Sequence, residues 1–151
     1  MRNQHLKDLS YGPMNYVKEW HTYFVNGYKF HTQAWTKGKK IINSGVHVKG
    51  LTEGATDDFY GIIQHIYELE YNITSYPKRV VLFYCYWFDP MSRGTRVDPK
   101  YGIVEILMDR SYNLFDPFIS THNVRQVFYV SYLATRRILV NLSMINLEKH
   151  M

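Results

Sequence analysis

Histidines and carboxylates are the residues of this chain that could bind a metal ion or carry acid–base chemistry. The chain has seven histidines, but none follows HExxH spacing and none is paired with cysteine as in a zinc site. The carboxylates considered for a pair of metal ions are Asp58, Asp89, Asp109 and Asp116. Asp89 and Asp116 each precede a proline, where a role in a turn or a helix cap explains them. We therefore expect no metal site and no cofactor.

The single cysteine, Cys85, is the candidate nucleophile. It sits in an apolar run between Phe83 and Trp87, where a thiol packs as a small hydrophobic group. One cysteine excludes an internal disulfide. The stretch GATDDFYG at 54–61 lacks the Lys-Ser/Thr end of a phosphate-binding loop. The sequence therefore predicts a protein that is not an enzyme.

Aromatic side chains offer a binding site of another kind. Aromatic residues make up 17% of the chain, and rings that converge beside a carboxylate can enclose a methylated lysine. The aromatic candidates, with Asp89 as the anionic wall, are Trp20, Trp35, Tyr84, Tyr86 and Trp87. The alternative is that Trp87 and its neighbours belong to the hydrophobic core.

Basic residues form the third candidate site. The formal net charge of +5 lies entirely in residues 1–56, which hold eight Lys/Arg and three Asp/Glu. Such an excess is typical of a surface that binds nucleic acid or an acidic protein, although a solvated basic face is the alternative. The candidate nucleic-acid-binding residues are Lys29, Lys37, Lys39, Lys40 and Lys49.

Two apolar runs in the middle of the chain must position these side chains. The runs 58–71 (DFYGIIQHIYELEY) and 80–90 (VVLFYCYWFDP) are connected by eight residues, which favours an antiparallel hairpin. A change of phase near Gln64-His65 predicts a β-bulge, and Gly61 marks a bulge or a close backbone approach. A helix is the competing interpretation of the first run. Both faces of the second run are apolar, so we expect that strand to be covered on both sides.

Shorter signals predict the remaining elements. Asn26-Gly27 between apolar runs predicts a hairpin with a type I′ turn, and Asn43 to Gly45 predicts a second turn. Pro13 could open a short helix, and Asp116-Pro117 predicts another of about two turns, to roughly Asn123. No run approaches the length of a membrane span. The fold class we expect is mainly β: a small antiparallel, partly closed barrel or bent sheet with one or two short helices.

Several of these segments, in this order, resemble one plant family. They are YFVNGYKFHT (23–32), NSGVHVKG (43–50), DFYGII (58–63), VVLFYCYWFDP (80–90) and DPFISTHNVRQVFYV (116–130). The family is a domain of unknown function at the C-terminal end of En/Spm-type (CACTA) transposon proteins, next to the transposase. After Arg137 the family continues with a Trp-containing strand, whereas this chain reads ILVNLSMINLEKHM and lacks the transposase part.

The resemblance implies an organisation and a cellular context. It suggests an N-terminal tail (1–12), one β-rich domain (13–137) and a divergent C-terminal tail (138–151) that could hold one more strand or a helix. The layout is also similar to bromo-adjacent homology (BAH) domains, which are interaction modules of chromatin. These likenesses imply an intracellular, nuclear accessory domain that binds a transposase or a chromatin protein, and no membrane. DNA binding through the basic N-terminal third is the alternative.

Overall fold

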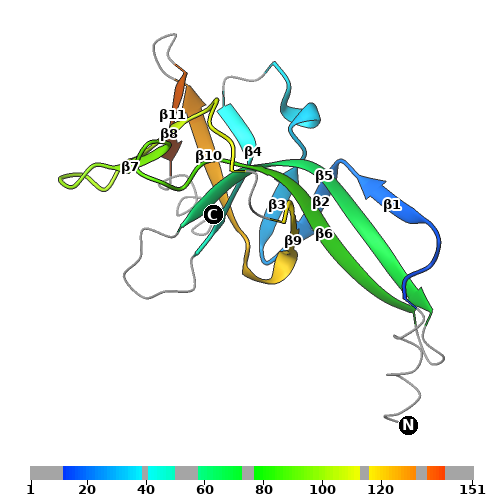
Figure 1. Ribbon diagram of the computed structural model, residues 1–151. Helices are drawn as coiled ribbons and strands as arrows, with labels where there is room; N and C mark the ends of the chain where they lie inside the picture. The colour runs from blue at the N-terminus through cyan, green and yellow to red at the C-terminus, as the bar shows by residue number, and fades with distance from the viewer. Residues whose placement is uncertain are drawn as a thin grey trace.

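The protein is described by a computed structural model that covers residues 12–38, 41–49, 58–72, 77–112, 116–131 and 136–141. Most of these residues form antiparallel strands (Figure 1). The strands are β1 (Val17–Trp20), β2 (Thr22–Val25), β3 (Tyr28–His31), β4 (Ile41–Val48), β5 (Phe59–Asn72), β6 (Pro77–Trp87), β7 (Thr95–Val97), β8 (Val104–Leu107), β9 (Phe118–Ser120), β10 (Arg125–Ser131) and β11 (Arg137–Asn141). Two single-turn 3₁₀ helices, η1 (Ala34–Thr36) and η2 (Thr121–Asn123), complete the described elements.

One large sheet holds most of the strands. Its order is β7-β8-β11-β10-β4-β5-β6-β9, and β1 adds to β5 beside this path. The two ends of the order, β7 and β9, do not meet, so the sheet is bent and is not closed into a barrel. This confirms the mainly β fold class, and of the two expected forms, a partly closed barrel or a bent sheet, the structure shows the bent sheet. Strand β11 lies between β8 and β10, so the sheet continues past Arg137. Of the strand and the helix that were considered for the C-terminal tail, the structure therefore shows a strand at residues 137–141.

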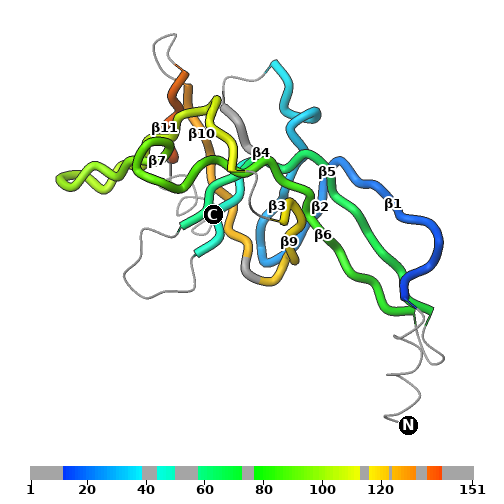
Figure 2. The backbone as a smooth tube through the Cα atoms, in the orientation of Figure 1, coloured from blue at the N-terminus to red at the C-terminus, as the bar shows by residue number. Residues whose placement is uncertain are grey.

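The long β5–β6 hairpin confirms the central prediction. The two strands pair from Gly61–Trp87 to Asn72–Pro77, and the register shifts between Ile63 and His65, where the sequence predicts a bulge. On the edge of β5 that faces away from β6, the partner strand changes at this bulge. The residues before it pair with β4, and the residues from Ile66 to Leu69 pair with β1. The second half of the hairpin, with β1 beside it, projects from the rest of the molecule (Figure 2). We use the name arm for this half of β5 and β6 together with the two strands that pair with it, β1 and β9.

Two hydrophobic cores lie on opposite faces of the sheet. The first contains Ile63, Ile66, Phe83 and Trp87, and the β2–β3 hairpin covers it with Phe30. The Asn26-Gly27 turn of that hairpin is confirmed, because both residues have the positive φ angles of a type I′ turn, 54° and 77°. The bent sheet encloses the second core, which contains Tyr60, Phe88, Ile106, Val127, Tyr129 and Ile138.

Three local predictions are wrong. No helix follows Pro13: Val17–Trp20 is a strand, because the edge of β5 offers it a ladder. Of the helix predicted to run to about Asn123, only the last turn forms, as η2. Residues 118–120 form β9 instead, since they pair with β6 and the Pro117 carbonyl accepts a hydrogen bond from the Cys85 N–H at 2.8 Å. Asp116 does accept the Phe118 N–H at 3.0 Å, but this cap-like bond precedes a strand. Gly45 lies inside the continuous strand β4 and not in a turn.

Candidate functional site

The predicted basic residues lie on separate elements. Lys29 lies on β3, Lys37 follows η1 and Lys49 follows β4. All three side chains are exposed. Within the described ranges none of these three lysines forms an ion pair with a carboxylate. Lys39 and Lys40 lie outside the described residues. Three lysine charges are therefore available to solvent, but nothing in their placement gathers them into one groove.

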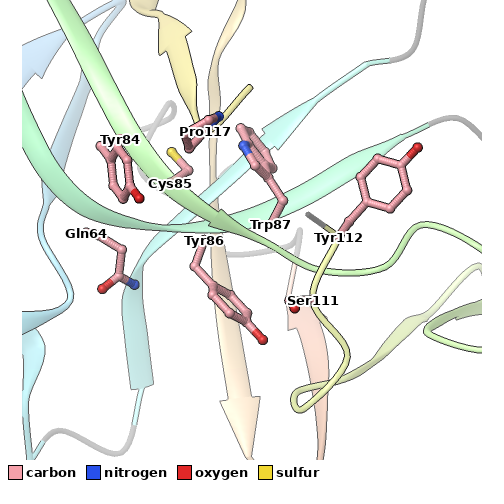
Figure 3. A pocket seen from close by; sticks show the side chains of 8 residues that line it. All are labelled: Gln64, Tyr84, Cys85, Tyr86, Trp87, Ser111, Tyr112 and Pro117. Atoms are coloured by element: carbon pink, nitrogen blue, oxygen red, sulfur yellow. The ribbon is translucent and has the colours of Figure 1, made fainter. Parts of the chain in front are cut away.

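Three of the predicted cage aromatics border one cleft. The cleft, of about 320 Å³, lies at the edge of β6. Its lining residues are Gln64, Tyr84, Cys85, Tyr86, Trp87, Ser111, Tyr112 and Pro117. Figure 3 shows Tyr86 and Trp87 on opposite sides of β6, so their rings do not converge on one point. None of the lining residues is a carboxylate, and Trp87 is only 5% exposed because it packs in the first core.

The other candidates of the aromatic cage lie elsewhere. Trp35 is exposed in η1, where it stacks on His31 with ring centroids 6.1 Å apart. Trp20, on β1, donates its Nε1–H to Glu68 Oε2 at 2.7 Å. Asp89 organises the turn after β6: its Oδ1 accepts the Met91 N–H at 2.9 Å, and its Oδ2 lies 3.6 Å from Arg110 Nε. The structure therefore does not bring Trp35, Trp20 or Asp89 to the cleft.

Cys85 is a core residue in the described structure. It is 2% exposed, and burial raises the pKa of its thiol. A protonated thiol is a poor nucleophile, which fits packing and not attack on a substrate. Within the described ranges, no three His, Cys, Asp or Glu side chains gather closely enough to hold a metal ion.

His47 is a buried histidine at the rim of the second core. Its Nε2 lies 3.2 Å from Asp58 Oδ2, and its ring packs 4.9 Å from that of Tyr60. Burial lowers the pKa of His47 below its ordinary value of 6.5; the carboxylate of Asp58 opposes this effect, whereas Arg125 and Lys49 add to it. His47 is therefore neutral at pH 7 and acts as a packed ring.

This burial predicts a stability that depends on pH. The unfolded chain binds a proton at His47 more readily than the folded protein, so this group lowers the free energy of unfolding as the pH falls below about 6.5. The slope from one group is at most about 1.4 kcal/mol per pH unit. Urea unfolding of the wild type and of His47→Gln between pH 7.5 and 5 measures it. The variant should show the shallower dependence, and equal slopes would contradict the assignment.

The described residues contain another candidate site that the sequence did not single out, the open face of the arm. Side chains that share this face are fixed by the register: Val17, Leu69 and Val80 lie in one row, and Glu19, Tyr67 and Leu82 in the next. Phe118 and Tyr84 follow in a third row with His65. Val17 and Phe118 are 44% and 43% exposed, Glu19 is exposed as well, and the others are partly buried. This face is apolar over several strands and lacks a covering element among the described residues.

An apolar groove runs over this face. It has a volume of about 250 Å³ and is lined by Val17, Tyr67, Leu69, Leu82 and Phe118. Aromatic contacts hold one wall in place: the Phe118 ring lies 6.3 Å from that of Tyr67 and 5.1 Å, edge-on, from that of Tyr84. His65 stacks on Tyr67 at 5.5 Å, and Glu19 Oε1 lies 2.7 Å from its Nδ1. The groove is therefore preformed by mutually packed rings.

The arm reverses the usual orientation of an amphipathic strand. Glu68 and Glu70 alternate with Tyr67, Leu69 and Tyr71, a pattern that conventionally places the carboxylates in solvent. Here Glu68 is 8% exposed on the face that also carries the core residues Ile66 and Phe83, where it contacts Trp20 and Arg79. The apolar residues in the outer half of β5, Tyr67, Leu69 and Tyr71, consequently lie on the open face. The sequence signal was present, since Val80, Leu82 and Tyr84 add a second apolar row, but alternation alone does not say which face is covered.

Comparison with known proteins gives one partial match. The family model described as Domain of unknown function (DUF4216) matches residues 67–139. The matched part runs from the outer half of β5 to β11 and includes four of the five groove residues, Val17 being the exception. Searches of the curated proteins and of the solved structures found no match. The two described helices are single turns, and neither could cross a membrane.

Proposed function

We propose that this chain is a non-catalytic protein-interaction domain that binds its partner through the apolar groove of the arm. The observation that carries the proposal is the reversed alternation of β5, which leaves Tyr67 and Leu69 partly exposed on the open face while it buries Glu68. Contiguous apolar surface of this kind on a folded domain is typical of binding sites. An exposed aromatic ring beside aliphatic side chains suits the anchors of a protein interface.

The cellular setting of the proposal rests on the sequence resemblance. The ordered motifs from residue 23 to residue 130 resemble the domain of CACTA-type transposon proteins, and the layout is similar to BAH modules of chromatin. We accordingly place the chain in the plant nucleus, as an accessory domain whose partner is a transposase or a chromatin protein. DNA binding through Lys29, Lys37 and Lys49 is the competing proposal, favoured by their exposure and by the net charge of +5.

The test compares matched charge insertions in the groove and outside it. Proteins captured from plant nuclear extract on the wild-type domain are identified, purified and titrated against wild type, Leu82→Glu and Phe24→Glu. Phe24 is 70% exposed on β2, away from the groove, and serves as the control. We expect Leu82→Glu to weaken binding at least about tenfold, because it places a charge in an apolar contact, and Phe24→Glu to bind as wild type does.

Two outcomes would overturn the proposal. The first is that no purified protein binds, or that the partner binds Leu82→Glu as tightly as wild type. The second is binding of duplex DNA that falls steeply between 50 and 200 mM salt and is lost when Lys29, Lys37 and Lys49 are changed together to Glu. That second result would establish the nucleic-acid function in place of the protein partner. Circular dichroism of Leu82→Glu shows beforehand that the variant is folded.

A further inference from the structure

The shape of the groove restricts what can fill it. A second copy of the chain that docked the same face with the two-fold axis through the groove would place hollow against hollow and leave an unfilled space of twice the volume. Unfilled apolar space forfeits the contacts that stabilise an interface. The occupant must therefore present a convex row of apolar side chains.

The charges on β1 disfavour some of the registers in which the edge of the arm could pair with its own copy. Among the described strands β1 pairs only with β5, so its other edge is open. In an antiparallel pair, residues directly opposite each other point to the same face of the sheet. When two copies of β1 pair by two-fold symmetry, one residue must therefore lie directly opposite its own copy, at the centre of the pair. Centring on Lys18 or Glu19 places like charges directly opposite, which destabilises the pair. These two registers of self-pairing are therefore disfavoured at the edge.

The charges around the groove indicate the chemistry of the partner. Glu19 at the inner end is already held 2.7 Å from His65. Lys78 lies on the same face at the outer end, opposite Tyr71 and next to the row of Leu69 and Val80. It is exposed and, within the described part of the chain, has no carboxylate partner. The free charge at the outer end of the groove is therefore the positive charge of Lys78.

We infer that the groove binds an amphipathic segment of another protein that carries an acidic residue at the end next to Lys78. In this arrangement bulky apolar side chains of the segment fill the space between Val17, Leu82 and Phe118, and an Asp or Glu of the segment pairs with Lys78. The apolar contacts supply most of the affinity, whereas Lys78 selects segments that carry an acidic residue at its end of the groove. This inference rests on the proposed function, because it names the partner of the same groove.

A peptide library tests the inference directly. Random 12-residue peptides displayed on phage are selected on the wild-type domain and counter-selected on Leu82→Glu, and the enriched peptides are synthesised and titrated by fluorescence anisotropy. We expect a consensus with bulky apolar residues and at least one Asp or Glu. Lys78→Glu should weaken these peptides roughly fivefold, as for a partly exposed ion pair, and Lys29→Glu should leave them unchanged. A peptide in which Lys replaces the acidic residue should regain affinity for Lys78→Glu.

The outcomes separate the inference from the function on which it rests. Peptides that require Leu82 but show no acidic preference and no effect of Lys78→Glu would overturn the acidic partner and leave the interaction groove standing. Peptides that bind Leu82→Glu as well as wild type would overturn both. Light scattering that shows a dimer dissociated by Leu82→Glu would identify a second copy as the occupant. Tighter binding of synthetic peptides 1–11 or 142–151 would identify a segment of this chain instead.

Discussion

Replacing Trp87 by alanine is expected to lower the free energy of unfolding by about 3–5 kcal/mol. The indole is 5% exposed, packs in the first core with Phe83, and lies against Gly61 of the neighbouring strand. Its removal leaves a cavity that the surrounding strands cannot close, since both are held in register along their length. Urea unfolding followed by circular dichroism measures the loss.

Trp87→Phe is the matched control for this prediction. It keeps an aromatic ring in the core and removes the indole Nε1, a buried donor without a hydrogen-bond partner in the described structure. We therefore expect a much smaller loss for phenylalanine than for alanine. If Trp87→Ala instead unfolded at the wild-type urea concentration and lost only a binding partner, Trp87 would belong to a binding site and not to the core.

Gly45→Ala is the second substitution with a large expected effect. A Cβ at this position would lie 2.4 Å from the Val127 carbonyl oxygen and 2.7 Å from Tyr129 Cε2. The β4–β10 ladder fixes the backbone oxygen, so the two strands would have to separate. Overpacking of this kind typically costs about 1–3 kcal/mol, and a backbone contact places Gly45 at the upper end of that range or above it.

Gly61→Ala provides the comparison within the same sheet. A Cβ there would lie 2.7 Å from Trp87 Cε3 and 2.8 Å from the Tyr86 carbonyl oxygen. Its closest neighbour is a side-chain ring, which can shift further than a paired backbone. We expect Gly45→Ala to lower the urea midpoint more than Gly61→Ala does. The reverse order, or a Gly45→Ala variant as stable as wild type, would mean that β4 and β10 are not packed this closely.

The elements that local chemistry determines were predictable from the sequence. Asn26-Gly27 has the turn residues that a type I′ hairpin requires, and the phase change at Gln64-His65 marks the bulge because strand alternation has a period of two. Of the two interpretations of Gly61, a bulge or a close backbone approach, the second is confirmed, since a Cβ there would lie 2.8 Å from the Tyr86 carbonyl oxygen. These signals are local in the chain, or they depend on one partner strand.

The wrong predictions share a different cause. Val17–Trp20 and Phe118–Ser120 are strands only because β5 and β6 present open ladder edges to them. Asp116-Pro117 carries the residues of a helix start, yet the Pro117 carbonyl bonds to Cys85 instead. Gly45 resembles a turn residue until β10 is placed against it. In each case contacts between distant parts of the chain override the local preference.

The candidate site was the least predictable part. Tyr84, Tyr86 and Trp87 were correctly grouped on one strand, but their alternation turns them to opposite sides of it. The groove residues on β5 were visible as an alternating stripe, whose outward orientation depends on the β2–β3 hairpin covering the other face. Sequence alternation therefore predicts that two faces differ, and only the tertiary structure shows which of them is open.

Methyl NMR of the protein with a library-selected peptide tests the central claim most directly. If the groove is the binding site, the methyl signals of Val17, Leu69 and Leu82 should shift on titration, while those of the core residues Val46 and Ile106 stay in place. Leu82→Glu should abolish the shifts without altering the core signals. Shifts that leave Val17, Leu69 and Leu82 unchanged and appear only around Lys29 and Lys37 would contradict the account.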